Sequence, residues 1–430
     1  MPGLDELLDA ARNGYESARP VSGRRAKAAT DVLPGGNTRS VLDFRPYPFR
    51  VAGVDGPYLI DVDGHRYLDL LGNYSAGLLG HRPGVVADAV RAVLDQGWSL
   101  GAITSAEAEL ARLVADRFDS IDQIRFTNSG TEANLMAIAT AKHVTGRDVV
   151  VAFRAGYHGG VLYHGDGGTG LLVPHRWEVA EYNDTVGVQS LFASLGEQIA
   201  CVIVEPMLAA SGCIPGSKTF LEEIRRSSAD NGSIMIFDEV MTSRLSPGGA
   251  QSLLGIRPDM TTLGKYLAGG LPFGAFGGGR DLMAVFDPHS GGTLTHGGTF
   301  NNDELSLAAG IAALGSILDD SVLRAVNERG DRLRSGLNEV FADAGVPMCA
   351  TGLGSLLAIH GTAGPVERIS DLDDSDDRIK ELLFFDLLAA GYYMARRGFI
   401  ALSLDISDEH VDEFLEEVAS WADSLTGRMG

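Results

Sequence analysis

The sequence predicts an α/β protein with a mainly parallel sheet in the middle of the chain and a smaller α+β unit. Between about residues 85 and 315, short apolar runs alternate with longer helical stretches, which is the pattern of buried parallel strands joined by helices. Before them, residues 51–70 hold short alternating runs split by Asp-Gly steps, as in antiparallel hairpins. After them, short apolar runs lie between two long helical stretches.

Residues 1–75 form the first predicted segment and are assigned to the smaller domain. An amphipathic helix opens the segment, and a glycine-punctuated loop follows at residues 34–40. The hairpins of residues 51–70 complete it.

Residues 76–315 are predicted to form the large α/β domain. Its buried strands are expected at residues 148–153, 200–204 and 233–237, and its helices at 131–144 and 220–228. Continuous apolar strands of this kind favour a parallel sheet.

Residues 316–430 are predicted to form the C-terminal α+β part of the smaller domain. Its long helices are expected at about residues 303–342 and 408–425, and its strands at 352–358 and 399–404. The acidic stretch at residues 371–377 predicts a solvated loop.

Composition and charge exclude several classes of protein. The 430 residues are 45% hydrophobic and 21% charged, which is too apolar for a disordered chain. The formal charge of −22 repels phosphate backbones and anionic lipids, so we expect neither nucleic acid nor a membrane as a partner. Three cysteines far apart predict no disulfide framework and no metal site. Without a run of about 18 apolar residues or a secretory start, the chain is expected to be cytoplasmic.

Two residues at predicted strand ends are candidates for chemistry. Asp238 ends an apolar strand, where ligands of open α/β sheets bind, although a helix-capping aspartate would have the same local sequence. Lys265 lies among small and apolar residues, where lost hydration favours the free amine that attacks carbonyl groups. A surface lysine whose stem packs on apolar neighbours is the alternative.

The residues Ser129, Gly130 and Thr131 lie where a predicted strand runs into a helix. Backbone N–H groups, two hydroxyls and the positive end of the helix dipole would suit a phosphate there. Ordinary helix capping explains the hydroxyl residues as well. The segment is neither a P-loop nor a dinucleotide-binding fingerprint.

Glycine marks the remaining candidates, and its 55 copies are nearly twice the usual share. Tyr157 and His158 are flanked by glycines, so the tyrosine could lie on a planar ring or plug a loop against the core. Thr299 stands in another glycine turn, which alone indicates only a loop. A phosphate cradle, a ring platform, a carboxylate and a desolvated lysine together meet the demands of pyridoxal phosphate.

In order and spacing, these motifs resemble those of the class III pyridoxal-phosphate-dependent aminotransferases over nearly the whole chain. The motifs are Asn128 to Asn134, Tyr157-His158-Gly159, Glu205-Pro206-Met207, Phe237 to Met241, Leu263-Gly264-Lys265 and Gly298-Thr299-Phe300. Residues 126–136, 240–244 and 274–278 are most similar to the β-phenylalanine aminotransferase branch, beside the glutamate semialdehyde aminomutases. The resemblance implies a fold-type I enzyme with a mainly parallel seven-stranded central sheet and a small domain from both termini.

The resemblance also implies a role for each matched residue. Lys265 would bind the cofactor as a Schiff base and carry the proton between substrate and cofactor, and Asp238 would keep the ring nitrogen protonated. The other implied cofactor residues are Ser129, Gly130, Thr131, Tyr157, His158, Glu205, Val240 and Met241, with Thr299 completing the neighbouring site of a homodimer. The implied substrate residues are Arg39, Tyr74 and Arg397, and the adjacent Arg396 leaves the choice between the two arginines open.

The resemblance thus implies an enzyme that moves the amino group of a β-amino acid, such as 3-amino-3-phenylpropanoate, to a 2-oxo acid, with 2-oxoglutarate expected. An aminomutase is the alternative; it returns the amine to another carbon of one substrate and needs no external 2-oxo acid. A catalytically silent, cofactor-binding sensor is a third reading. Sensors of this fold carry an added DNA-binding unit, and the charge of −22 and the lack of a spare domain argue against one.

Overall fold

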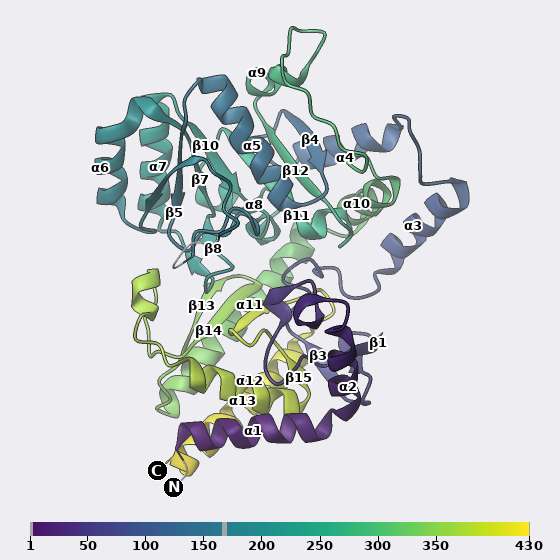
Figure 1. Ribbon diagram of the computed structural model, residues 1–430, viewed down its shortest axis with the longest axis vertical. Coiled ribbons are helices and arrows are strands. Elements are labelled where there is room, and N and C mark those ends of the chain that lie inside the picture. Colours follow the sequence, from purple (N-terminus) through teal and green to yellow (C-terminus); the bar gives the residue numbers. More distant parts are fainter. Residues whose placement is uncertain (1–2, 166–169, 430) are drawn as a thin grey trace. The chain divides into compact units, whose positions relative to one another are not determined.

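The computed structural model describes residues 3–165 and 170–429 (Figure 1). The chain forms two compact units. The smaller unit contains Met1–His81, Glu328–Val366 and Ser370–Gly430, and the larger unit contains Arg82–Asn327 with Glu367–Ile369. Both ends of the chain therefore contribute to the smaller unit. The junctions after His81 and Asn327 lie C-terminal to the boundaries expected after residues 75 and 315.

A seven-stranded sheet forms the core of the larger unit, with the strand order β4-β12-β11-β10-β7-β5-β6. Its strands are β4 (Gln123–Thr127), β5 (Val149–Phe153), β6 (Arg176–Ala180), β7 (Ile199–Val204), β10 (Ile234–Asp238), β11 (Met260–Gly264) and β12 (Gly274–Gly278). Neighbours are parallel from β11 to β6, whereas β12 runs antiparallel to β11 and β4. The predicted mainly parallel, seven-stranded sheet is confirmed.

The middle strands form where the sequence has unbroken apolar runs, and β5 and β7 are buried along their whole length. Helix α5 (Gly130–Thr145) packs on β12, β11, β10 and β7, and α7 (Lys218–Asn231) packs on β10 and β7. The other helices of this unit are α3 (Gly84–Gln96), α4 (Ser105–Ala115), α6 (Thr185–Leu195), α8 (Gly249–Leu254), α9 (Arg280–Met283) and α10 (Glu304–Ser316). A short hairpin of β8 (Met207–Leu208) and β9 (Ile214–Pro215) follows β7. The carboxyl ends of the parallel strands meet at one edge of the sheet.

The prediction of a single helix over residues 303–342 is wrong. The structure has α10 (Glu304–Ser316) and α11 (Asp320–Asp343), which are bent by 86° at the break between them. The Asp319 carboxylate accepts hydrogen bonds from the Val322 N–H and the Ser321 hydroxyl, so a new helix is capped there. In the described residues, no single helix has the length and apolarity of a membrane span; this bent pair meets the criterion by length and composition only.

Two small sheets organise the smaller unit. The first has the order β1-β2-β3-β15, and the second has the order β13-β14-β16. Their strands are β1 (Val51–Asp55), β2 (Tyr58–Asp61), β3 (Arg66–Asp69), β13 (Cys349–Leu353), β14 (Leu356–His360), β15 (Tyr392–Tyr393) and β16 (Phe399–Ala401). The antiparallel hairpins predicted over residues 51–70 are confirmed.

Three local expectations for this unit need correction. The strand expected at residues 352–358 is a hairpin, because Gly354 adopts a left-handed conformation and reverses the chain. The strand expected at 399–404 ends at Ala401. The N-terminal helix is two helices, α1 (Leu4–Ala18) and α2 (Pro20–Ala29), since Pro20 begins a new helix. The acidic stretch at 371–377 is largely irregular, between the turn Ile369–Leu372 and α12 (Asp377–Ala390).

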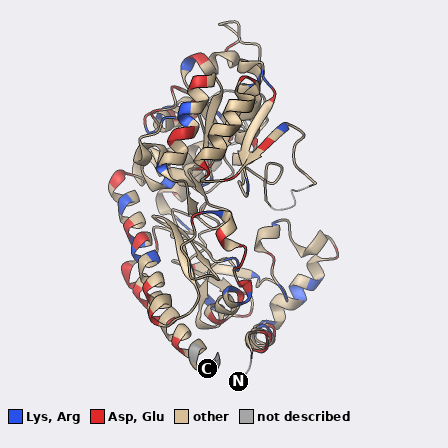
Figure 2. Ribbon diagram, turned by 90° about the vertical axis from the view of Figure 1, so that its left-hand side faces the viewer, with Lys and Arg blue, Asp and Glu red and all other residues tan. Residues whose placement is uncertain are grey.

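Acidic and basic residues are interspersed along the helices in Figure 2. On α11 and the C-terminal α13 (Asp408–Met429), Arg329 and Arg332 both pair with Asp408, and Arg332 also pairs with Asp412. Exposed pairs of this kind each stabilise a fold only slightly. They align two long helices without a buried charge.

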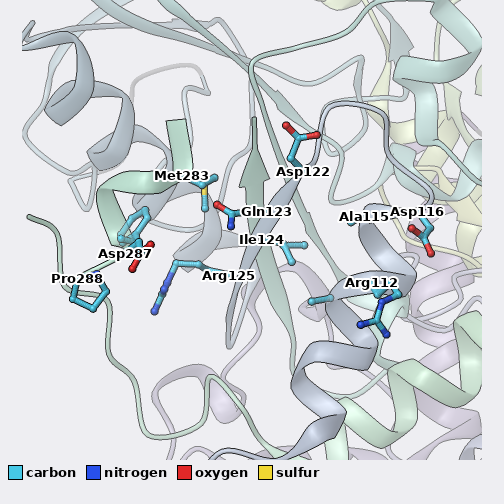
Figure 3. A pocket seen from close by; sticks show the side chains of 12 residues that line it. Arg112, Ala115, Asp116, Asp122, Gln123, Ile124, Arg125, Met283, Asp287 and Pro288 are labelled. Carbon is cyan, nitrogen blue, oxygen red and sulfur yellow. The ribbon is translucent and has the colours of Figure 1, made fainter. Parts of the chain in front are cut away.

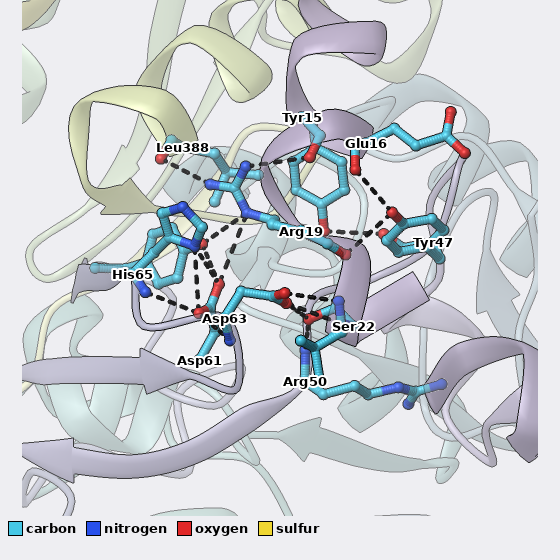
Figure 4. Close-up of polar contacts among 12 residues, drawn as sticks. Tyr15, Glu16, Arg19, Ser22, Tyr47, Arg50, Asp61, Asp63, His65 and Leu388 are labelled. Atoms are coloured by element: carbon cyan, nitrogen blue, oxygen red, sulfur yellow. Dashed lines mark hydrogen bonds and ion pairs between the residues drawn. The ribbon is translucent and has the colours of Figure 1, made fainter. Parts of the chain in front are cut away.

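A buried charge does join the N-terminal helices to the hairpins (Figure 4). The Arg19 Nε donates to the Tyr67 hydroxyl at 2.7 Å, and it lies 3.8 Å from Asp61 Oδ2. The Tyr67 hydroxyl in turn donates to the same Asp61 oxygen at 2.6 Å. Nearby, the carboxylate of the half-buried Asp63 accepts from the backbone N–H groups of Val21 and Ser22, near the start of α2.

Replacing Asp61 with alanine should lower the free energy of unfolding by about 3 kcal/mol, because Arg19 then stays buried without its partner charge. Asp63→Ala is the matched control. It removes a helix-capping carboxylate at the same junction and should cost only about 1 kcal/mol. Urea denaturation followed by circular dichroism measures both losses, and equal losses would show that burial of Arg19 does not govern this junction.

Candidate active site

The carboxylate of Asp238 lies at the carboxyl end of β10, in the middle of the large sheet, and is 4% exposed. Its Oδ2 accepts hydrogen bonds from Asn134 Nδ2 and His158 Nδ1, both at 2.8 Å. Its Oδ1 accepts from the Val240 N–H at 3.0 Å. The aspartate therefore belongs to a buried polar network at the edge where parallel strands end, and it is more than a helix cap.

The residues expected to bind phosphate begin α5. The Ser129 Oγ accepts from the Glu132 N–H at 3.2 Å, and the Glu132 carboxylate accepts from the Asn128 N–H at 2.8 Å. Ordinary helix capping is thus present. It leaves the first N–H groups of the helix, those of Gly130 and Thr131, without acceptors inside the helix. Such groups, with the dipole behind them, can bind an anion.

Glycines bring the ends of three elements together here. A Cβ on Gly130 would lie 2.7 Å from Val240 Cγ2, and a Cβ on Gly264 would lie 3.5 Å from the Gly130 nitrogen. The start of α5 and the ends of β10 and β11 therefore converge. Lys265 follows Gly264 at once and has a φ of 58°, a left-handed conformation that costs a non-glycine residue about 1 kcal/mol. Such backbone strain often accompanies functional residues.

The loop after β5 supplies Tyr157 and His158. His158 is buried against Asp238, whereas Tyr157 is 44% exposed, and the Tyr163 ring centroid lies 5.7 Å from that of Tyr157. Gly159 has a φ of 127°, and a Cβ there would clash with the Thr131 hydroxyl. The loop is thus packed against the start of α5, with the partly exposed Tyr157 beside it.

Glu205 follows β7, and its carboxyl group accepts from the N–H groups of Tyr157 and Ala209. Burial, and then the nearby negative charge of Asp238, raise its pKa well above the usual value, although Lys265 acts in the opposite direction. Glu205 Oε2 is buried without a hydrogen-bond partner in the described part of the chain. A buried polar atom of this kind calls for a partner, and a protonated Glu205 can donate to a ligand oxygen.

The last expected cofactor residues differ in exposure. Val240 and Met241, which follow β10, are half-buried. Thr299 is exposed in a turn, and Asn301 of the same turn accepts from Asn128 Nδ2 at 3.2 Å. The larger unit therefore brings together every expected cofactor residue except Thr299, which is exposed.

Sequence reasoning gave no role to Asn134 and Thr262, which complete the buried network. Asn134 Oδ1 accepts from the Thr262 hydroxyl at 2.6 Å. The signal was present in both cases. Asn134 is a polar residue on the apolar face of α5, and Thr262 is a buried hydroxyl residue two positions before the end of β11.

In the smaller unit, Arg39, Tyr74 and Arg397 lie together although they are far apart in sequence. The guanidinium carbons of Arg39 and Arg397 lie 5.8 and 5.1 Å from the Tyr74 ring centroid. Burial raises the pKa of Tyr74. Arg396 instead reaches Glu381, with 3.4 Å between Nη1 and Oε2. The geometry therefore groups Arg397, and not Arg396, with Tyr74.

A left-handed turn presents Tyr74. Residues 72–75 all have φ values between 48° and 71°, although only Gly72 adopts them without strain. Asp69 Oδ1 holds the turn by accepting from the N–H groups of Leu71 and Gly72. Asn73 Oδ1, on the same turn, accepts from Arg39 Nη1 at 2.7 Å. Sequence reasoning missed Asn73.

A separate cavity of about 630 Å³ lies along α4, β4 and the end of α9 (Figure 3). Both arginine and aspartate side chains line it, among them Arg112, Arg125, Asp122 and Asp287. It contains none of the expected site residues, so the candidate active site is not this cavity.

The residues of the larger unit fit pyridoxal phosphate. A buried carboxylate suits the ring nitrogen, a helix N-terminus suits the phosphate, and an exposed aromatic ring suits one ring face. The unpartnered Glu205 Oε2 indicates a ligand with a polar atom at this place, and Gly130 and Gly264 let the start of α5 approach the ends of β10 and β11 closely. Among the described residues, no group of His, Cys, Asp or Glu side chains is arranged to hold a metal ion.

Comparisons with known proteins agree with this geometry. A family model described as aminotransferase class-III matches residues 44–164 and 174–420. The chain is 45% identical over 418 residues to a β-phenylalanine transaminase of Variovorax paradoxus, covering 97% of this chain and 96% of the relative. The crystal structure of a β-phenylalanine aminotransferase from that organism matches with a TM-score of 0.97 and 44% identity over 99% of each chain.

Two further comparisons are more distant. A glutamate-1-semialdehyde 2,1-aminomutase of Desulforudis audaxviator is 38% identical over 408 residues, covering 90% of this chain and 94% of the relative. A transaminase solved with pyridoxal phosphate bound is 29% identical, with a TM-score of 0.86 and coverage of 94% and 97%. With a family match over most of its length and a site that fits the cofactor, the chain belongs to the class III aminotransferases and depends on pyridoxal phosphate.

Proposed function

We propose that this aminotransferase moves the amino group of a β-amino acid, such as 3-amino-3-phenylpropanoate, to 2-oxoglutarate. The pairing of Arg39 and Arg397 around Tyr74 carries the proposal, because two guanidinium groups beside one aromatic ring can bind a carboxylate next to an apolar substituent. The β-phenylalanine transaminase that is 45% identical to this chain supports the same substrate class. A dicarboxylate acceptor could engage both arginines.

In the proposed site each residue has a defined task. The cofactor, when bound, supplies an electron sink for the substrate carbon. Asp238 would keep the ring nitrogen protonated, and the start of α5 at Ser129, Gly130 and Thr131 would bind the phosphate. Lys265 Nζ would hold the cofactor covalently and then move the proton between the substrate carbon and the cofactor.

The residues around the ring would position it. Tyr157 would stack on one face, and Val240 with Met241 would pack against the other. His158 would orient Asp238 through the hydrogen bond of 2.8 Å. Glu205 would donate from its buried carboxyl group to an oxygen of the ligand.

We also propose a homodimer in which Thr299 completes the neighbouring phosphate site. Around Thr299 lie exposed apolar side chains, which commonly mark an interface. Asn302 Nδ2 donates to the Ala102 carbonyl at 3.4 Å, so the two loops that carry these side chains lie side by side. The side chains are Trp98, Leu100, Ile103 and Phe300. A cytoplasmic location is proposed as well, since the three cysteines are buried thiols outside any disulfide, as is usual in a reducing compartment.

The direct test incubates the purified enzyme with 3-amino-3-phenylpropanoate, with and without 2-oxoglutarate, and measures glutamate. We expect glutamate only when the acceptor is present. The aminomutase alternative, favoured by the relative that is 38% identical, needs no acceptor and would form an isomer of the substrate in both samples. Absence of acceptor-dependent glutamate would refute the proposal.

Substituting Arg39 should separate carboxylate recognition from catalysis. In Arg39→Gln, kcat/KM for 3-amino-3-phenylpropanoate should fall about 10- to 100-fold, because a charge-assisted pair is lost. The rate with 1-phenylethylamine, which has no carboxylate, should change by less than about threefold. Both amines are measured in single half-reactions, because the rate can then be determined even for an amine that reacts slowly.

The matched control for this substitution is Arg396→Gln, since Arg396 already pairs with Glu381. Its kcat/KM for both amines should stay close to that of the unaltered enzyme. Equal losses with both amines in Arg39→Gln would show that Arg39 does not recognise the carboxylate.

A further inference from the structure

Asn134 lies just over one turn from the start of α5 and is 1% exposed. A buried amide on a helix must find partners for one oxygen and two N–H groups. Asn134 finds all three outside its own helix. Its Nδ2 donates to Asp238 Oδ2 at 2.8 Å and to the His158 carbonyl at 3.0 Å, and its Oδ1 accepts from the Thr262 hydroxyl at 2.6 Å.

The partners determine how this amide is oriented. An ionised carboxylate and a backbone carbonyl can only accept, so the amide nitrogen must face Asp238 and His158. The Thr262 hydroxyl must then donate to the amide oxygen. Asn134 thereby joins α5 to the ends of β10 and β11 and to the loop after β5.

In this arrangement the two carboxylate oxygens of Asp238 have different hydrogen-bond partners. Oδ2 accepts from two side chains, Asn134 and His158, whereas Oδ1 accepts, among the described residues, only from the Val240 backbone N–H. Each carboxylate oxygen has about two lone-pair positions. Those of Oδ2 are filled, and one on Oδ1 remains for a further donor.

We propose that Asn134 is a positioning residue that acts through Asp238. By filling Oδ2 it turns Oδ1 toward the protonated ring nitrogen of the cofactor, and its N–H dipole stabilises the negative charge that this contact needs. Thr262 supports this role, because its hydroxyl keeps the amide from rotating. The inference rests on the proposed contact between Asp238 and the ring nitrogen.

The test compares pyridoxal phosphate with its 1-deaza analogue, which has a carbon in place of the ring nitrogen. Apoenzyme affinity for each compound is measured by fluorescence titration, so the readout does not depend on turnover. In Asn134→Leu, affinity for pyridoxal phosphate should fall about tenfold or more, since a hydrogen bond to a charged group is lost. Affinity for the analogue should fall less than about threefold.

Variants of Thr262 extend the test. Thr262→Val should weaken pyridoxal phosphate selectively but less than Asn134→Leu does, and Thr262→Ser should restore the affinity because it keeps the donor hydroxyl. Thr140→Val is the matched control, since Thr140 is buried on the same helix and donates only to the Met136 carbonyl. It should leave both affinities unchanged.

Equal losses for the two compounds in Asn134→Leu would overturn the inference, because Asn134 would then only support the fold. If Asn134→Leu does not fold, Thr262→Val provides the test. Equal losses of affinity for the two compounds in Thr262→Val would then overturn the inference. Asp238→Asn separately tests the underlying assignment, which is the contact of Asp238 with the ring nitrogen. If Asp238→Asn also fails to discriminate between the compounds, the contact of Asp238 with the ring nitrogen is wrong; if it discriminates while Asn134→Leu does not, only the role of Asn134 is wrong.

Discussion

Lys265→Ala should abolish transamination, with kcat lowered by at least about 10⁴-fold. One side chain is proposed both to hold the cofactor covalently and to move the proton, and proton transfer alone contributes about 10²- to 10⁴-fold. The position agrees with that double task. Lys265 comes directly after β11, beside Gly130 and Val240 through Gly264, and its charge influences Glu205.

The measurement is the absorbance band of the lysine-bound cofactor together with turnover, and both should disappear in Lys265→Ala. Lys218→Ala is the matched control, because Lys218 lies exposed on α7 and pairs only loosely with Glu222, at 3.8 Å. It should keep the band and the rate. A Lys265→Ala enzyme with unaltered turnover would refute the assignment of the lysine.

Asp238→Asn should lower kcat about 10²- to 10³-fold, the range found when a preorganised electrostatic partner is removed. The side chain keeps its shape but loses the charge that the ring nitrogen requires. KM should change much less, because Asp238 is proposed to act on the cofactor and not on the substrate carboxylate.

Asp259→Asn provides the comparison for this prediction. Asp259 precedes β11, so it lies at the opposite end of the strands from Asp238, where it pairs with Arg225 and accepts from the Met235 N–H. Loss of the Asp259 charge should leave kcat nearly unchanged. A similar fall in kcat in both variants would mean that Asp238 contributes through folding and not through the cofactor.

Local sequence patterns were sufficient for most of the larger unit. β5 and β7 are continuous apolar runs, which have few alternatives to buried parallel strands, and Asp238 and Lys265 come directly at strand ends. A phosphate cradle, a carboxylate and a lysine at one site together indicated pyridoxal phosphate as the cofactor. The structure places all of these residues at one edge of the sheet.

The errors have physical causes that short-range patterns do not contain. The helix expected at 303–342 breaks because one carboxylate, Asp319, caps a new helix within an otherwise helical sequence. The strand expected at 352–358 reverses at Gly354, whose conformation depends on the pairing of β13 with β14.

The substrate residues show a different limit. Arg39, Tyr74 and Arg397 come from three distant segments, and only the folded smaller unit brings them together. Arg396 and Arg397 are equivalent by sequence, and the position of Glu381 distinguishes them. Asn134 was overlooked because its importance lies in three long-range hydrogen bonds.

The central claim is that a β-amino acid gives its amino group to the cofactor held by Lys265. It is tested most directly by one half-reaction: purified enzyme is mixed with 3-amino-3-phenylpropanoate without any 2-oxo acid, and the absorbance of the bound cofactor is followed. The account predicts stoichiometric conversion to the pyridoxamine form, and recovery of the starting spectrum with one glutamate per site when 2-oxoglutarate is added. A spectrum that the β-amino acid leaves unchanged would contradict the account.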